Sequence, residues 1–271
     1  MTEGQVTFES SLTLGEAGAD DCCSAQIGAE WAQGRAAYGG LVAGLMARAL
    51  ERQLPVERSL RSAVVTFVAP VAPGSVTVRA SVLRAGRALT HGEARVIQNG
   101  AVCAVLTAAY GETRPTSLVF SAAAAPATDP PEKLPQLPYL EGVMPRFNKQ
   151  FEFRLANNRV PFSASARANM GGYVRYAGGG PADAAGVLGL LDSWPPAILP
   201  LLKKFAPAST VTWMVDIVAD LPARGTRSDA FYRYDAEGVA AEGGYGSCEA
   251  RLWGPDGKLV AASRQMVVEF S

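Results

Sequence analysis

The sequence contains a single histidine, His91, and only four cysteines, and this scarcity limits the chemistry that the chain can carry. The cysteines show no Cys-x-x-Cys spacing and histidine ligands are nearly absent, so a zinc site is not expected. A serine nucleophile would depend on His91 alone, and no Gly-x-Ser-x-Gly motif occurs, which argues against a nucleophilic esterase. Cys103 and Cys248 fall in alternating apolar segments, where cysteine is usually a small buried hydrophobe. We therefore expect neither a metal nor another cofactor.

The chain also lacks an excess of charge of either sign. It carries 25 Lys and Arg against 25 Asp and Glu, and charged residues make up 18% of the chain. This balance leaves no basic surface of the kind that binds nucleic acid or an anionic membrane. No apolar run reaches the length of about 18 residues that a transmembrane helix needs, and the polar N-terminus does not resemble a signal peptide. We expect a cytoplasmic protein whose partners include neither nucleic acid nor a membrane.

An internal repeat organises what the sequence does contain, most clearly as a hairpin that occurs twice. Residues 92–96 are GEARV and residues 248–252 are CEARL. Each segment leads to a turn, Asn99-Gly100 or Asp256-Gly257, and then to a second apolar strand. Such turns favour hairpins because glycine accepts a positive φ angle at little cost. The repeat predicts two copies of one antiparallel unit.

Each hairpin is preceded by a matching strand and a matching helix. Residues 61–70 and 210–219 are rich in β-branched and aromatic residues, which favour strands. Further upstream, residues 40–52 and 181–193 are apolar nearly all round, which predicts buried helices. Pro181 suits the first helical position, where its missing N–H is not needed. Small residues in both helical segments allow a neighbouring element to approach closely.

Between the two copies lies a segment rich in Pro and Ala, residues 114–150, which has no sheet-forming period. We interpret it as a connector between an N-terminal repeat, residues 1–113, and a C-terminal repeat, residues 151–271. Each repeat combines one buried helix with a run of antiparallel strands. A strongly curved antiparallel sheet wrapped around a central helix satisfies this pattern, and the fold class is α+β.

Six segments, in this order and spacing, make the sequence resemble the acyl-CoA thioesterase II family of double-hotdog proteins. The segments are Tyr38-Gly39-Gly40, residues 67–74 (FVAPVAPG), residues 82–87 (VLRAGR) with the hairpin that ends at Tyr110, residues 190–196 (LLDSWPP), residues 209–212 (STVT) and residues 257–265 (GKLVAASRQ). The resemblance implies a double hotdog, in which each of two repeats wraps a curved antiparallel sheet around a central helix. It also implies hydrolysis of an acyl thioester of CoA or of an acyl carrier protein.

The resemblance implies the residues of the site as well. In the family, an Asp on the second helix, a Thr at the start of the following strand and a Gln on the last strand bind the nucleophilic water. By position these residues are Asp192, Thr210 and Gln265. Thr212 is an alternative to Thr210, because it lies two residues on and would face the same side of a regular strand. The family often has a polar or His-containing stretch where residues 212–214 are apolar here, which bears on acyl specificity.

These residue types suit hydrolysis without a covalent intermediate. A carboxylate at the end of a buried helix can act as the base, because partial burial raises its pKa toward neutral pH. Gln265 offers a donor and an acceptor and Thr210 offers a hydroxyl, so the two can hold one water molecule. Tyr38 and the backbone N–H groups of Gly39 and Gly40, at the start of the first helix, are the expected substrate-binding groups.

The repeat supports this assignment independently of the resemblance. In the alignment of the two copies, Gln265 corresponds to Ala108 and Thr210 corresponds to Leu60. Asp192 likewise falls opposite an apolar residue of the first helix. Polar groups thus occur in the second copy where the first copy has apolar ones, which predicts one water site per chain.

Two other functions remain open from the sequence. A hotdog-fold hydratase or dehydratase also acts on acyl thioesters, but it uses an Asp–His pair, and His91 precedes a strand and has no Asp five residues before it. A non-catalytic acyl-thioester binding protein would not need the set of Asp, Thr and Gln. Because members of the family often form dimers or tetramers, we also expect a homo-oligomer, whose size the sequence does not fix.

Overall fold

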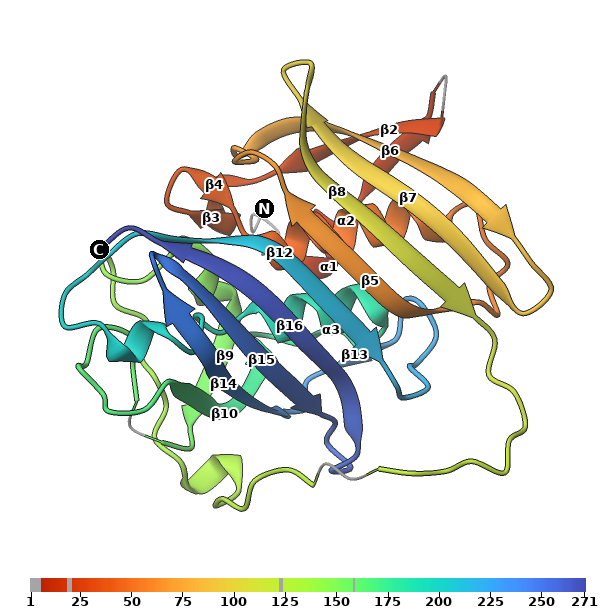
Figure 1. The fold of residues 1–271 in the computed structure, drawn as a ribbon. Coiled ribbons are helices and arrows are strands. Elements are labelled where there is room, and N and C mark those ends of the chain that lie inside the picture. The colour runs from red at the N-terminus through yellow and green to blue at the C-terminus, as the bar shows by residue number, and fades with distance from the viewer. Residues whose placement is uncertain (1–5, 19–20, 122–123, 158) are drawn as a thin grey trace, which may run out of the picture.

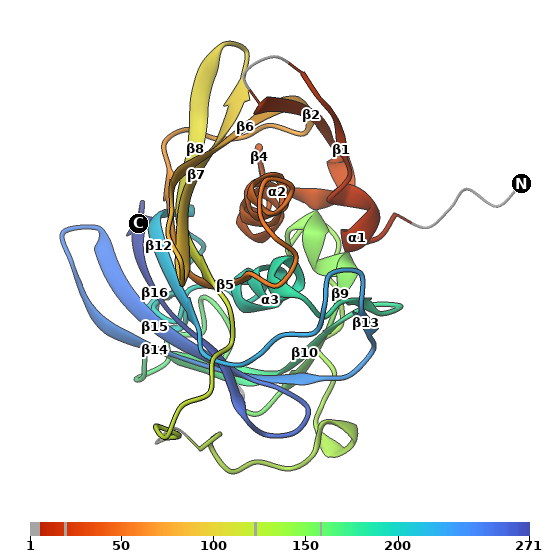
Figure 2. The same ribbon diagram turned by 90° about the vertical axis from the view of Figure 1, so that its right-hand side faces the viewer.

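The computed structural model describes residues 6–18, 21–121, 124–157 and 159–271. Within these residues, twelve strands form one antiparallel sheet in the order β1-β2-β6-β7-β8-β5-β12-β16-β15-β14-β10-β9 (Figure 1). The sheet curves around two helices, α2 (Gly39–Glu51) and α3 (Ala184–Asp192), which lie side by side inside it (Figure 2). The double hotdog that the sequence predicts is confirmed.

Six strands of the sheet come from each half of the chain. The N-terminal half supplies β1 (Leu14–Ala17), β2 (Cys22–Ile27), β5 (Ser59–Phe67), β6 (Gly74–Ala85), β7 (Leu89–Gln98) and β8 (Ala101–Gly111). The C-terminal half supplies β9 (Phe151–Leu155), β10 (Asn169–Tyr176), β12 (Ala208–Ile217), β14 (Tyr232–Glu242), β15 (Tyr245–Trp253) and β16 (Leu259–Glu269). The shorter elements are α1 (Phe8–Ser11), β3 (Ala32–Gln33), β4 (Ala36–Ala37), β11 (Gly180–Pro181) and β13 (Arg227–Ser228).

The order of the strands is symmetric about the central pair, β5 and β12. Both central strands also carry a β-bulge at the same place. In β5 the pairing with β8 shifts between Leu60 and Ser62, and in β12 the pairing with β16 shifts between Thr210 and Thr212. The matched bulges confirm the alignment of the two copies, in which Thr210 corresponds to Leu60.

Both helices are buried along almost their whole length, as their apolar sequences predict. In α2 every residue from Gly40 to Leu50 is buried, and Asp192 is the one residue of α3 that is not. Small residues bring the helices close together, since a Cβ added to Gly44 of α2 would lie 3.7 Å from the Cβ of Ala185 in α3.

The two helices run antiparallel. Arg48, in the last turn of α2, pairs at 2.6 Å with Asp183, which is the N-cap of α3. At the opposite end, the hydroxyl of Tyr38, the N-cap residue of α2, donates a hydrogen bond to the Gly189 carbonyl of α3. This arrangement places the N-terminus of α2 beside the C-terminus of α3, where Asp192 lies.

The predicted start of the second helix is wrong. The helix begins at Ala184, and the side chain of Asp183 accepts a hydrogen bond from the Gly186 N–H. Pro181 lies before the helix in β11, where it pairs with Arg227 of β13. Asp183 is the stronger start signal because its carboxylate satisfies an N–H group that has no partner within the helix.

The strands before each helix are missing from the sequence prediction. β1 and β2 precede α2, and β9 and β10 precede α3, and these four strands form the two edges of the sheet. β2 has the sequence CCSAQI and β10 contains Gly171-Gly172, so neither is rich in the β-branched residues that mark a strand.

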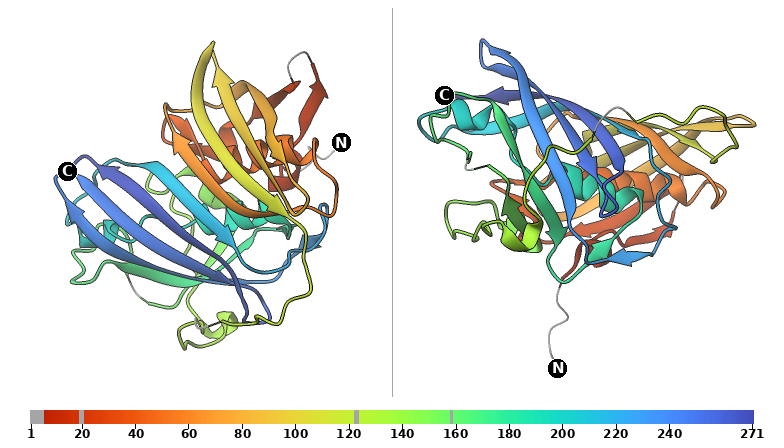
Figure 3. Two further views of the ribbon diagram at one scale, coloured as in Figure 1. Left: turned by 45° about the vertical axis from the view of Figure 1, so that its right-hand side comes forward. Right: turned by 90° about the horizontal axis from the view of Figure 1, so that it is seen from below.

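Residues 114–150, the predicted connector, run along the outside of the C-terminal half (Figure 3). Among their described residues there is no strand. They contain two short 3-10 segments, Pro131–Lys133 and Arg146–Gln150, and one isolated bridge from Gln136 to Arg154. The end of this segment enters the core, because the buried ring of Phe147 stacks on Tyr38 with the ring centroids 4.2 Å apart. Its boundaries remain a prediction.

Candidate active site

Asp192 lies where the two helices meet. Its carboxyl group accepts a hydrogen bond from the backbone N–H of Gly40, in the first turn of α2. Gly39 also lies beside it, since a Cβ added there would lie 2.9 Å from Oδ2 of Asp192. The Tyr38 side chain does not cap α2. Asp192 therefore supplies, from the neighbouring helix, an acceptor for the unpaired N–H groups at the start of α2.

Two effects act in opposite directions on the Asp192 carboxyl group. Burial disfavours its charged form, whereas the hydrogen bond from Gly40 favours it. Burial is the larger effect and raises the pKa of Asp192 from 3.8 to about 7. Asp192 is nevertheless the one residue of α3 that is not fully buried. A carboxylate with such a pKa can accept a proton at neutral pH.

Thr210 and Gln265 form a second pair, on the inner face of the sheet. The hydroxyl of Thr210 in β12 donates a hydrogen bond of 2.9 Å to Oε1 of Gln265 in β16. Gln265 is 9% exposed, which is unusual for a glutamine and is possible here because its amide oxygen has a partner. With Oε1 engaged, Nε2 of the same amide remains as a donor.

The β-bulge in β12 separates Thr210 from its rival, Thr212. In a regular strand both would face the same side, but the extra residue at Val211 breaks the alternation. Thr210 is partly buried against Gln265, whereas Thr212 is exposed. The expectation that the two threonines share a face is wrong, and of the two only Thr210 contacts Gln265.

The segment that follows Asp192 connects the contact between Asp192 and Gly40 with the Thr210–Gln265 pair. It crosses over β15, where the backbone N–H groups of Ala197 and Ile198 donate hydrogen bonds to the sulfur of Cys248. Cys248 lies directly opposite Gln265 in the ladder between β15 and β16. Asp192 and the Thr210–Gln265 pair are thus held at the same end of the core, and among the described residues no hydrogen bond joins them.

Tyr38 has a different place from Gly39 and Gly40. Its side chain is 0% exposed, and besides its bond to Gly189 it stacks on Phe147. Tyr38 therefore fixes α2 against α3 and does not line an open surface. Among the five other predicted site residues, Asp192 contacts Gly39 and Gly40, and Thr210 contacts Gln265.

Sequence reasoning missed Phe67 and Phe147. The ring of Phe67, at the end of β5, would lie 3.0 Å from a Cβ added to Gly39, so it borders the start of α2 next to Asp192. Phe67 begins residues 67–74, one of the segments that carry the family resemblance, so the sequence does mark its neighbourhood. Phe147 lies at the end of the Pro- and Ala-rich segment, where nothing in the sequence marks it.

Two family models cover most of the sequence. A model of the acyl-CoA thioesterase N-terminal domain matches residues 27–111, and a model of the acyl-CoA thioesterase C-terminal domain matches residues 124–268. The chain belongs to the acyl-CoA thioesterase family. Among curated proteins, no sequence matches this member of the family.

Several solved structures have the same fold as this family member over nearly the whole chain. A hot dog fold protein of unknown function from Alicyclobacillus acidocaldarius has a TM-score of 0.86 and 23% identity, covering 97% of this chain and 98% of that one. A proposed thioesterase II from Thermobifida fusca has a TM-score of 0.83 and 21% identity, covering 97% of each chain. An acyl-CoA thioesterase II from Mycobacterium marinum has a TM-score of 0.73 and 18% identity, covering 97% and 98%. At these identities the similarity shows the fold.

At the other end of the helix pair, where α2 ends and α3 begins, ion pairs fill the position that corresponds to the site. There Arg48, which is 1% exposed, lies 3.3 Å from Glu9, 3.0 Å from Glu51 and 2.6 Å from Asp183. The carboxylates at this end therefore share a buried guanidinium as their ion-pair partner, unlike Asp192. The contrast favours one site per chain.

Two features of other protein classes do not occur within the described part of the chain. No helix there is long and apolar enough to cross a membrane. No group of three or more His, Cys, Asp or Glu side chains there could hold a metal ion.

Proposed function

We propose that this chain hydrolyses acyl thioesters to a free acid and a thiol. The released thiol is CoA or an acyl carrier protein. The observation that carries the proposal is the carboxyl group of Asp192, held at the start of α2 by Gly40 and at the same end of the core as the Thr210–Gln265 pair. Membership of the acyl-CoA thioesterase family supports it.

In the proposed reaction one water molecule lies between Asp192, Thr210 and Gln265. The water oxygen attacks the carbonyl carbon of the thioester while Asp192 takes its proton. The bond to sulfur then breaks, and the leaving thiolate takes the proton from Asp192. No covalent bond to the protein forms. Because Asp192 already occupies the Gly40 N–H, the neighbouring Gly39 N–H is the first backbone donor for the carbonyl oxygen.

The test is release of thiol from a panel of acyl-CoAs and acyl carrier proteins by the wild-type protein and by Asp192→Asn. Removing the base should lower kcat by about 10²–10⁴-fold. Asp216→Asn is the matched control, because Asp216 is an exposed Asp on β12, and it should change kcat less than twofold. Thiol release from none of the substrates, with acyl-CoA still bound, would show an acyl-thioester binding protein instead.

A hotdog-fold hydratase fits the structure less well. Its histidine would have to be His91, which is exposed on β7. The adjacent Gly92 lies against Leu50 in the last turn of α2, since a Cβ added to Gly92 would be 2.6 Å from Cδ2 of Leu50. His91 is therefore at the end of α2 far from Asp192. Incubation with an enoyl-CoA should yield the free acid and no hydroxyacyl-CoA.

A further inference from the structure

Trp213 lies beside the proposed water site, at the centre of the sheet. On β12 it stands directly opposite Gln265 of β16 on one side and Val65 of β5 on the other. Its side chain is 1% exposed and therefore points inward. Because of the bulge at Val211, Trp213 shares this inner face with Thr210. The indole ring therefore lies next to the Thr210–Gln265 pair on the inner face of the sheet.

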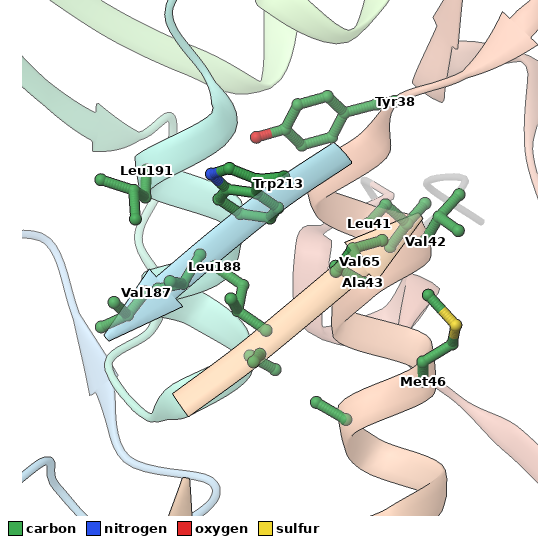
Figure 4. Packing of buried hydrophobic residues seen from close by; sticks show 14 of the residues in the cluster. Tyr38, Leu41, Val42, Ala43, Met46, Val65, Val187, Leu188, Leu191 and Trp213 are labelled. Atoms are coloured by element: carbon green, nitrogen blue, oxygen red, sulfur yellow. The ribbon is translucent and has the colours of Figure 1, made fainter. Parts of the chain in front are cut away.

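The indole fills the space between the sheet and the helices. Figure 4 shows it projecting from β12 toward the helices, between Tyr38 at the start of α2 and Leu191, the neighbour of Asp192 in α3. Tyr38, Leu188, Leu191 and the strand neighbour Val65 are all at most 2% exposed. The core is closely packed at this point, so further carbon atoms fit there only if a side chain gives way.

The position of the indole has a consequence for the acyl group. In the proposed reaction the thioester carbonyl lies between Asp192 and the Thr210–Gln265 pair. From there, an acyl chain that enters the apolar space between helices and sheet meets Trp213 first. The apolar walls would otherwise favour longer chains, because each buried methylene adds to binding.

We propose that Trp213 closes the acyl pocket and restricts this chain to short acyl thioesters, an inference that rests on the proposed thioesterase function. Trp213 then determines specificity by its size. Excluding or admitting a single methylene in an apolar pocket changes kcat/KM by about 10–200-fold, so one tryptophan can set the limit on chain length.

The experiment compares kcat/KM for butanoyl-CoA, octanoyl-CoA and dodecanoyl-CoA. The wild-type protein should prefer butanoyl-CoA over dodecanoyl-CoA by at least about tenfold. In full-length Trp213→Leu, the ratio of dodecanoyl-CoA to butanoyl-CoA turnover should rise by at least about tenfold. Trp253→Leu is the matched control, since Trp253 is also a buried tryptophan but lies further along β15 from Cys248, and its ratio should stay as in the wild type.

Thermal melting followed by circular dichroism shows whether each variant folds. If Trp213→Leu does not fold, the milder Trp213→Phe should raise the relative turnover of octanoyl-CoA. The wild-type profile decides the matter even without a variant, because equal turnover of butanoyl-CoA and dodecanoyl-CoA would overturn the proposal. An unchanged ratio in a folded Trp213→Leu would do the same. Failure of the wild type to release thiol from any acyl-CoA or acyl carrier protein is a different outcome, which would refute the thioesterase function itself.

Discussion

At the scale of single residues, the carboxyl group of Asp192 combines two properties that seldom occur together. It is the final residue of an otherwise buried helix, yet it has a backbone donor, Gly40, from the next helix. Its own helix end disfavours a negative charge, and the start of α2 favours one. Burial of the carboxyl group outweighs the hydrogen bond from Gly40 and raises the pKa of Asp192 to about 7, where a carboxylate is a useful base.

The first prediction concerns the pH dependence of hydrolysis. With the pKa of Asp192 at about 7, the proton-accepting form predominates only above about that pH. We expect kcat/KM to rise with pH through this range and then to level off. The measurement is a pH profile with a short acyl-CoA. A profile that is flat from pH 5 to pH 9 would show that another group, or none, is the base.

The raised pKa of Asp192 also predicts how the free energy of unfolding depends on pH. Because the folded-state pKa of Asp192 lies above its ordinary value of 3.8, the folded protein binds this proton more tightly than the unfolded chain does. The stabilisation is complete below pH about 4 and is lost as the pH rises through about 7. Asp192→Asn cannot ionise, so it should gain stability relative to the wild type between pH 4 and pH 8. Urea unfolding at both pH values measures this, and an equal difference at both would contradict it.

A third prediction separates the two threonines. Thr210→Val removes the hydroxyl that contacts Gln265 and keeps the shape of the side chain, so kcat should fall by about 10–100-fold. Thr212→Val makes the same change at an exposed position on the other face and should leave kcat within twofold. Steady-state kinetics with one acyl-CoA measures both. A larger loss in Thr212→Val than in Thr210→Val would refute the assignment.

At the scale of elements, the bulge in β12 decides which side chains reach the site. Periodicity places Thr210 and Thr212 on one face, and one extra residue moves them to opposite faces. The counterpart bulge in β5 shows that it belongs to the repeat. Helix α3 gives a similar lesson, because its start depends on the capping side chain of Asp183 more than on Pro181.

The fourth prediction concerns the contact between the helices. Arg48 is buried and pairs with Asp183, Glu51 and Glu9, so Arg48→Met leaves the carboxylates of Asp183 and Glu51 without a positive charge beside them in the core. We expect a loss of about 3–5 kcal/mol in the free energy of unfolding at neutral pH. Arg95→Met is the control, because Arg95 and Glu93 form an ion pair at the surface, and it should cost less than about 1 kcal/mol. Denaturant unfolding measures both, and similar losses would contradict the role of Arg48.

At the scale of the whole molecule, the two repeats share one sheet and one core. The β5–β12 ladder joins them in the middle of the sheet, and α2 packs on α3 through Arg48, Tyr38 and small residues. Neither half therefore buries its helix alone. We expect a single cooperative unfolding transition in calorimetry, in which the calorimetric and van 't Hoff enthalpies agree. Two separate transitions would show that the repeats fold independently.

The sequence by itself determined the repeat, the two buried helices, the hairpins and the types of residue at the site. These depend on local signals, namely apolar periodicity, Asn-Gly and Asp-Gly turns, and polar residues in one copy where the other is apolar. Only the tertiary structure decided that Asp192 meets Gly40, that Thr210 and not Thr212 meets Gln265, and that Trp213 lies beside them. These contacts join residues far apart in the chain, and they depend on a bulge and on the antiparallel packing of two helices, which local signals do not encode.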